Sequence, residues 1–340
     1  MKITFKIFFA LALIFCIGGY LIMPNDNNGW HSPPKHPDAG KYEPWACAFE
    51  RGKVPPLNPE AEAMFLQARA LERSKPRPYL SDFDKQQIFE GYKKAAELQH
   101  WRAMINLANC YLNGFGTAAS VTSADAVYEE MMALGIPAGY YGKYTLVARG
   151  RGVPRDAARA RELLHLAADF GHPQAQYDLG EHYIDGRQRH KQGVGYHICA
   201  LRQGYAPSAN ALGMYSSIIE ENHTMAVEYY WRAVALGYEG AALELHSAYA
   251  KASATAGVQT NLGVAPDEEL SKKFNEMYEE ISADPTKRYP NLLIDLPIPE
   301  NPTLSRADSR KRKSFLRLKD GSWPDEVYPE LAPGYVTPRY

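Results

Sequence analysis

Small and apolar residues recur along the middle of this 340-residue chain with a period of 33 to 36 residues. Five copies align on one column, which holds Gln99, Gly135, Gly171, Gly204 and Gly237. Further columns follow four and eight residues later, and they hold Ala103, Gly139, Ala175, Ser208 and Ala241, then Leu107, Lys143, Leu179, Leu212 and Leu245. A spacing of four places residues on one face of a helix. Each copy therefore predicts two short helices, and the fixed period predicts a helical solenoid.

We name the helix before the aligned column helix B and the one after it helix A. B helices are expected near 85–98, 122–134, 156–170, 190–203 and 223–236, and A helices near 102–113, 138–149, 173–185, 206–217 and 239–251. The column glycine should end helix B in the left-handed conformation, and Gly114 and Gly150 should do the same for helix A. Lys143 interrupts the apolar stripe, so we expect Tyr144 and Val147 to take the core positions of that copy.

The third copy, from Leu163 to Gly186, resembles the Sel1-like repeat, a relative of the tetratricopeptide repeat. The family's pattern is matched at Ala167, Ala168, Gly171, Ala175, Leu179, Gly180, Tyr183 and Gly186. The resemblance covers residues 84–253 and implies an all-α fold, a right-handed α-solenoid of Sel1-like helix-turn-helix repeats. Such a solenoid offers an extended concave surface for binding another protein.

By analogy with tetratricopeptide arrays, the concave face takes positions three, six and ten residues after the column. The predicted contact residues are Arg102, Asn109, Tyr141, Gln174, Tyr177, Glu181, Asn210 and Met214. Tyr, Arg and Met are frequent anchors of protein interfaces. The alternative is that the C-terminal segment of the chain fills this groove itself.

The flanking segments have their own patterns. Residues 24–58 are rich in Pro, Asn, Gly and His and predict an extended tether, whereas residues 59–76 predict an N-terminal capping helix. A second capping helix is expected over 266–283, with Pro266 at its first position and three acidic residues in its first turn. Residues 284–340 read as a Pro- and aromatic-rich accessory tail, and we expect its apolar run from Leu292 to Ile298 to lie extended along the solenoid.

The N-terminal residues predict an export signal. Lys2 and Lys6 precede an apolar run of 17 residues over 7–23, the lower limit for a membrane-spanning helix. No clear cleavage site follows, so residues 1–23 predict an uncleaved anchor in the inner membrane in preference to a removed signal peptide. Positive residues before the run keep the N-terminus in the cytoplasm. Both interpretations place the solenoid in the periplasm.

Three cysteines follow that run, at Cys47, Cys110 and Cys199. An oxidising compartment permits one disulfide among them. Cys199 lies about three repeats from Cys110, which is too far for easy pairing in a stacked array. We expect a bond between Cys47 and Cys110, since the upstream segment should lie against the first copy; the alternative is three buried free thiols.

Net charge and sequence motifs indicate which classes of function are unsupported. The formal net charge of −1 gives no support for nucleic-acid binding. Five histidines cluster at His165, His172, His182, His190 and His197, but they fall on different repeat positions, so we expect packing or surface roles. No nucleophile elbow, phosphate loop or dinucleotide motif appears. We therefore expect no enzyme, no cofactor and no metal.

A basic stretch from Arg306 to Lys319 is compatible with an anionic lipid, an acidic protein face, or simple solvation of a short helix. The resemblance implies a more specific role. Exported Sel1-like proteins with an accessory tail include immunity proteins that neutralise toxins of the type VI secretion system, often lipases. We therefore expect a non-catalytic, protein-binding scaffold of this kind. The alternatives are a structural adaptor for an envelope or polysaccharide-secretion complex and, less favoured, an enzyme with a groove site.

Overall fold

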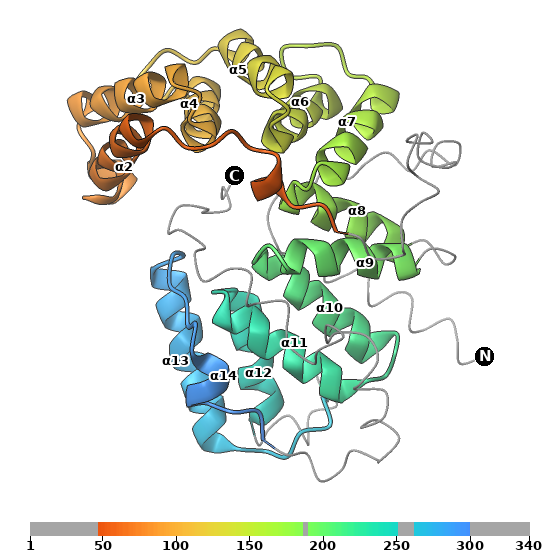
Figure 1. The fold of residues 1–340 in the computed structure, drawn as a ribbon. Helices are drawn as coiled ribbons and strands as arrows, with labels where there is room; N and C mark the ends of the chain where they lie inside the picture. Colours follow the sequence, from red (N-terminus) through yellow and green to blue (C-terminus); the bar gives the residue numbers. More distant parts are fainter. Residues whose placement is uncertain (1–46, 186–189, 251–261, 300–340) are drawn as a thin grey trace.

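The fold comes from a computed structural model that describes residues 47–185, 190–250 and 262–299. Within these ranges the chain forms helices and no strands. Successive helices pack side by side, each mainly on its neighbours in sequence, and the stack bends into an open curve (Figure 1). The predicted all-α solenoid is confirmed.

The helices follow the predicted order. After the short helix η2 (Glu50–Gly52), α2 (Pro59–Arg73) and η3 (Arg77–Tyr79) lead into the array. The B helices are α3 (Asp82–Glu97), α5 (Val121–Ala133), α7 (Ala157–Asp169), α9 (His190–Leu201) and α11 (His223–Ala235). The A helices are α4 (Trp101–Asn113), α6 (Pro137–Arg149), α8 (Pro173–Asp185), α10 (Ala206–Ile218) and α12 (Glu239–Tyr249). The array is followed by α13 (Glu268–Ala283) and α14 (Leu292–Asp295).

The turn between helix B and helix A is left-handed in every copy. The φ angles of the aligned column are +59° at Gln99, +71° at Gly135, +97° at Gly171, +77° at Gly204 and +79° at Gly237. Gly114 and Gly150 end α4 and α6 in the same conformation. The predicted role of these positions is confirmed, and Gln99 adopts it without being glycine.

The small column brings helix A against helix B. Ala103, Ala175, Ser208 and Ala241 are fully buried. A Cβ atom at Gly139 would lie 2.6 Å from the Cβ of Met131, so α5 and α6 approach too closely for any side chain there. As predicted for this copy, Tyr144 and Val147 are buried. Lys143 instead reaches Asp125 on α5, with Nζ to Oδ1 at 2.7 Å.

The core divides into three clusters that follow one another along the array. The first joins α2 to α6, the second joins α6 to α9, and the third joins α9 to α14. This division suits a solenoid, in which each repeat buries its apolar face on its neighbours and no single centre exists.

Both ends of the array are capped by a helix. The Asn58 side chain accepts hydrogen bonds from two backbone N–H groups in the first turn of α2, and the Asp267 side chain does the same for α13. The second capping helix therefore begins at Glu268, and the expectation that Pro266 occupies its first position is wrong, because the Asp267 side chain sets the start.

The apolar run of the tail is not fully extended. It forms one helical turn, α14, which packs on α11, and the indole N–H of Trp231 donates to the carbonyl of Leu296 over 2.9 Å. The short helix buries Leu292 against the third core cluster. The accessory tail beyond residue 299 and the basic stretch from Arg306 to Lys319 lie outside the described residues.

Residues 47–58, which we call the strap, are not a free tether. In Figure 1 the strap passes on the inner side of the curve from α2 to α8. The expected tether is therefore wrong for these residues, because the contacts given below bind them to the array. The rest of the expected tether and the expected anchor over 7–23 lie outside the described residues. No described helix is both long and apolar enough to cross a bilayer.

Candidate functional site

A disulfide fixes the start of the strap to the fourth repeat. Cys47 is bonded to Cys199 on α9, across a sequence separation of 152 residues, and Cys110 is a buried free thiol. The expected Cys47–Cys110 bond is therefore wrong. The strap begins at α9 and runs back to α2, so Cys47 lies far from the first core cluster, which contains Cys110. Burial there raises the pKa of the Cys110 thiol to about 12 and keeps it protonated.

Two glutamines hold the strap backbone next to the disulfide. The Gln203 side-chain oxygen accepts the Glu50 N–H over 2.9 Å, and the Gln176 side-chain amide donates to the Ala48 carbonyl over 3.0 Å. Gln203 also donates to the Gly171 carbonyl at 2.8 Å and to the Gln176 side-chain oxygen at 2.9 Å. We call Gln176 and Gln203 the glutamine clamp. The hydrogen bonds that the clamp makes to the strap go to its backbone N–H and C=O groups, so they fix the path of the strap.

The clamp is specific to one place in the array. The positions equivalent to Gln176 in the other copies are Met104, Tyr140, Ala209 and Ala242. Those equivalent to Gln203 are Leu98, Leu134, Phe170 and Leu236. Polar amides thus replace apolar or aromatic residues only where the strap docks.

Gly171 makes room for the strap. A Cβ atom there would lie 2.5 Å from the Phe49 carbonyl carbon and 2.6 Å from the Glu50 nitrogen. The equivalent Gly135 has a similar backbone conformation, but a Cβ atom there would meet nothing within 4 Å. Gly171 therefore serves both the turn and the close approach of a second chain segment.

Charged groups of the strap and of the array lie close to Phe49 and Glu50. The Arg202 guanidinium lies over the Phe49 ring at 5.0 Å, and the Arg102 guanidinium lies over the Trp101 ring at 4.9 Å. Glu50 is only 5 % exposed, and its Oε1 atom has no hydrogen-bond partner. Burial raises the Glu50 pKa to about 8, although the charge of Arg102 lowers it. At neutral pH this carboxyl is mostly protonated.

Tyr141 joins the second repeat to the third. Its hydroxyl donates to Asp178 Oδ2 over 3.0 Å, and its ring stacks on His172 with centroids 4.5 Å apart. Burial raises the pKa of Asp178 to about 7, against the effect of the Tyr141 hydrogen bond. The buried His172 caps α8 through Ala175 N–H, and burial lowers its pKa to about 3.

Tyr177 and Glu181 meet the same histidine of the next repeat. The Tyr177 ring lies edge-on to His197 with centroids 5.3 Å apart, and Glu181 Oε1 lies 3.2 Å from His197 Nε2. The His197 ring is fully buried, with Nδ1 also 3.3 Å from Ser208 Oγ. Two of the predicted contact residues thus lie over one interface between repeats.

The remaining predicted residues are spread along the array. Asn210 and Met214 lie one turn apart on α10, and the Met214 side chain is 48 % exposed. Arg102 and Asn109 both lie on α4, and Gln174 lies in the first turn of α8. The other seven predicted residues are half-buried. That they bind a protein stays a prediction.

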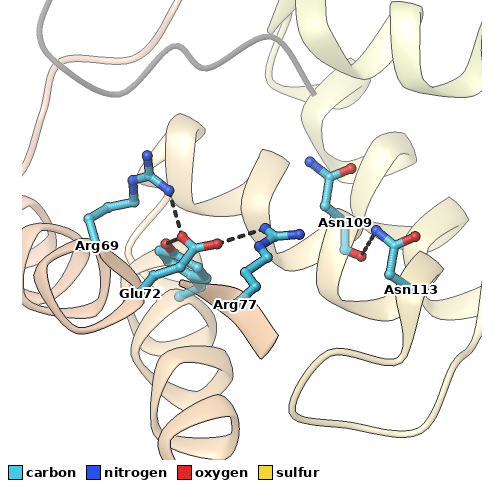
Figure 2. A network of polar contacts seen from close by, with 6 residues as sticks. Arg69, Glu72, Arg77, Asn109 and Asn113 are labelled. Atoms are coloured by element: carbon cyan, nitrogen blue, oxygen red, sulfur yellow. Dashed lines mark hydrogen bonds and ion pairs between the residues drawn. The ribbon is translucent and has the colours of Figure 1, made fainter. Parts of the chain in front are cut away.

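The Asn109 end of the array is held by a separate polar network (Figure 2). Glu72 accepts hydrogen bonds from Arg69 at 2.5 Å, from Arg77 at 2.7 Å and from the Tyr92 hydroxyl at 2.5 Å. Burial alone would raise the pKa of Glu72, but the hydrogen bonds and charges of its partners outweigh burial and lower it. The carboxylate is fully engaged, so this network joins α2 to α3 and offers no free acid for chemistry.

The described side chains do not assemble a metal centre. No three His, Cys, Asp or Glu side chains in this part of the chain lie close enough together to hold a metal ion. His165 and His172 are buried, and burial lowers the pKa of His165 to about 4. These two histidines are neutral packing groups at neutral pH.

The strap is the part of the site that the pattern of repeats did not predict. The sequence does indicate a contact at this place, because Gln176 and Gln203 occupy repeat positions that hold apolar or aromatic residues in the other copies. A buried polar side chain such as that of Gln176 requires hydrogen-bond partners. Those partners are the backbone groups of Ala48 and Glu50.

Comparison with known proteins agrees with this architecture. The Sel1 repeat family model matches residues 101–124, 140–172, 173–205 and 206–238. These four matches include α4, α8 and α10 entirely, together with the B-to-A turns at Gly171 and Gly204.

Two solved structures from Pseudomonas aeruginosa are similar over most of their length. The immunity protein Pa5087 is 35 % identical with a TM-score of 0.63, and the similarity covers 76 % of this chain and 96 % of that one. The immunity protein PA5088 is 32 % identical with a TM-score of 0.65, over 77 % of this chain and 96 % of that one.

A third relative has a different recorded role. An exopolysaccharide production negative regulator from Rhizobium meliloti (strain 1021) is 28 % identical over an alignment of 173 residues, and the similarity covers 45 % of this chain. The chain spans 62 % of the length of that relative.

Proposed function

Because the chain belongs to the family of Sel1-repeat proteins that includes the Pseudomonas aeruginosa immunity proteins Pa5087 and PA5088, we propose that it is itself an immunity protein. The fold and these relatives support a protein-binding scaffold. The finer proposal is a non-catalytic inhibitor that binds a toxin of the type VI secretion system, such as a lipase. The observation that carries it is the 35 % identity to Pa5087 over 96 % of that protein.

The proposed mechanism is stoichiometric occlusion. The predicted contact residues provide aromatic, Arg and Met side chains, which are common anchors of tight interfaces. Tyr141, Tyr177 and Glu181 are held by contacts to neighbouring repeats before any partner binds. Such preorganisation reduces the entropy that binding must overcome. A toxin covered by this face would lose access to its substrate without any chemistry by the inhibitor.

We place the protein in the periplasm, tethered to the inner membrane by residues 7–23. The Cys47–Cys199 disulfide supports this compartment, because disulfides persist in oxidising environments such as the periplasm. A lipase that attacks the membrane from the periplasmic side would meet its inhibitor there.

The test is protection of cells from one candidate toxin. The effector gene nearest to the gene of this chain is expressed with a periplasmic export signal, with and without the full-length protein. We expect growth to be restored by the exported protein and not by a version that lacks residues 1–23. Equal killing in all three strains, with both proteins present in the periplasm, would refute the proposal.

A second function is favoured by one observation. The similarity to the exopolysaccharide production negative regulator fits a structural adaptor for an envelope or polysaccharide-secretion complex. This alternative predicts a change in exopolysaccharide when the gene is deleted in cells that meet no toxin. The immunity proposal predicts no such change.

A further inference from the structure

The strap, which passes on the inner side of the curve, carries exposed positive charge. Its charged residues are Glu50, Arg51 and Lys53. Glu50 is buried, whereas Arg51 and Lys53 are exposed, and neither has a carboxylate within salt-bridge distance among the described residues. The exposed charge of the strap is therefore entirely positive, in a chain whose net charge is only −1.

Two further cations flank the same short segment. Arg202 lies over the ring of Phe49, and Arg102 is close enough to Glu50 for its charge to act on that carboxyl. Both guanidinium groups rest on aromatic rings, and both residues are half-buried. We call Arg51, Lys53, Arg102 and Arg202 the cationic cluster. It combines residues from the strap, from α4 and from the turn that follows α9.

The strap is held firmly enough to present these charges in one place. The disulfide fixes Cys47, the glutamine clamp fixes Ala48 and Glu50, and Asn58 caps α2 at the other end. Arg51 and Lys53 lie between these attachments. Fixed charges lose less entropy on binding than charges on a free tether.

We propose that the strap is part of the surface that receives the toxin, and that the cationic cluster pairs with an acidic face of that protein. This proposal rests on the proposed function and names the chemistry of the partner. Charge complementarity of this kind mainly accelerates association and selects the partner. The toxin should therefore carry a patch of Asp and Glu beside the region that enters the curve.

The test measures association of the full-length protein with the effector that it neutralises. In Arg51→Glu/Lys53→Glu we expect the association rate at low salt to fall at least about tenfold and to lose most of its dependence on salt. The control is Arg155→Glu/Lys272→Glu, which makes the same charge change. Arg155 is exposed in the loop between α6 and α7, and Lys272 is exposed on α13, with 78 % of its side chain accessible. We expect the control to associate at the wild-type rate.

A cross-linking measurement on the wild-type protein tests the same contact without depending on the folding of the variant. A carbodiimide joins a lysine amine directly to a carboxylate in contact with it. We expect Lys53 to be joined to an Asp or Glu of the effector, and Lys272 not to be. Absence of the Lys53 product, in a complex that forms with full affinity, would contradict the proposal.

Two other results would overturn the proposal while leaving the proposed function intact. One is protection and association by Arg51→Glu/Lys53→Glu equal to the wild type. The other is a loss of binding to phosphatidylglycerol vesicles in this variant while its association with the effector is unchanged. That result would show that the cationic cluster binds lipid. Failure of the wild type itself to protect cells would instead refute the proposed function.

Discussion

The Gln203 side-chain amide donates to the Gln176 side-chain oxygen over 2.9 Å, so the two glutamines that hold the strap also hold each other. Gln203 comes from the turn after helix B of the fourth repeat, and Gln176 comes from helix A of the third. The clamp therefore couples three segments that are distant in sequence, and it does so through one pair of amides.

Replacing Gln203 with Leu, the residue at three of the equivalent positions, should weaken the strap. The Glu50 N–H and the Gly171 carbonyl would lose their partner, and an unsatisfied buried group costs about 1–3 kcal/mol. We expect the free energy of unfolding to fall by about that amount. Hydrogen exchange should also accelerate at the Glu50 amide while the amides of α12 exchange as before. Unchanged exchange at Glu50 would mean that the clamp does not hold the strap.

Gly171→Ala and Gly135→Ala form a matched pair. Both positions have positive φ, so each substitution should cost about 1–2 kcal/mol of backbone strain. Only at Gly171 does the new methyl group meet the strap. We expect Gly171→Ala to lower the free energy of unfolding by more than Gly135→Ala, as measured by urea denaturation. A similar loss at both sites would contradict the close docking of the strap.

The disulfide should contribute strongly to stability. A covalent link between residues 152 positions apart restricts the unfolded chain, and its removal typically costs about 2–5 kcal/mol. We therefore expect Cys47→Ala/Cys199→Ala to be destabilised by that amount and to show no further loss when reductant is added. Cys110→Ala is the control: it should keep the full sensitivity to reductant, since the Cys110 thiol is free. Resistance of the wild type to reductant would contradict the assigned pairing.

Glu50 gives stability a measurable dependence on pH. Burial raises its folded-state pKa from the usual 4.5 to about 8, so the folded protein binds this proton more tightly than the unfolded chain does. This contribution to the free energy of unfolding is fully present below about pH 4.5 and is lost as the pH rises through 8. The free energy of unfolding then falls by at most about 1.4 kcal/mol per pH unit.

Glu50→Gln removes this ionisation and preserves the shape of the side chain. We expect the variant to match the wild type at pH 4.5 and to be more stable than it at pH 8.5. The buried His172 titrates in both proteins, so its contribution cancels in the difference. Urea unfolding at the two pH values measures the effect, and a stability difference that is independent of pH would show that Glu50 is not buried.

The repeat pattern was sufficient to predict the array because each repeat is stabilised by its neighbours in sequence. The column from Gln99 to Gly237 predicted the left-handed turn between helix B and helix A in each copy. The small column predicted the buried contacts between helices A and B. Lys143 was correctly assigned outside the core, since the stripe of that copy continues through Tyr144 and Val147.

The strap could not be predicted in the same way, because its contacts are long-range and unique. Nothing near Cys47 in sequence indicates that its partner is Cys199, and the pairing with Cys110 was chosen from proximity to the first repeat. The amides of Gln176 and Gln203 signalled that a buried polar partner was needed there. They could not identify that partner as the backbone of residues 48–50.

Hydrogen exchange of the full-length protein, with and without the effector that it neutralises, tests the central claim most directly. The account predicts that the effector slows exchange in the strap and in the A helices that carry Tyr177 and Met214. Exchange in the B helices α5 and α7 should change little. Protection confined to those B helices, with none in the strap or the A helices, would contradict the account.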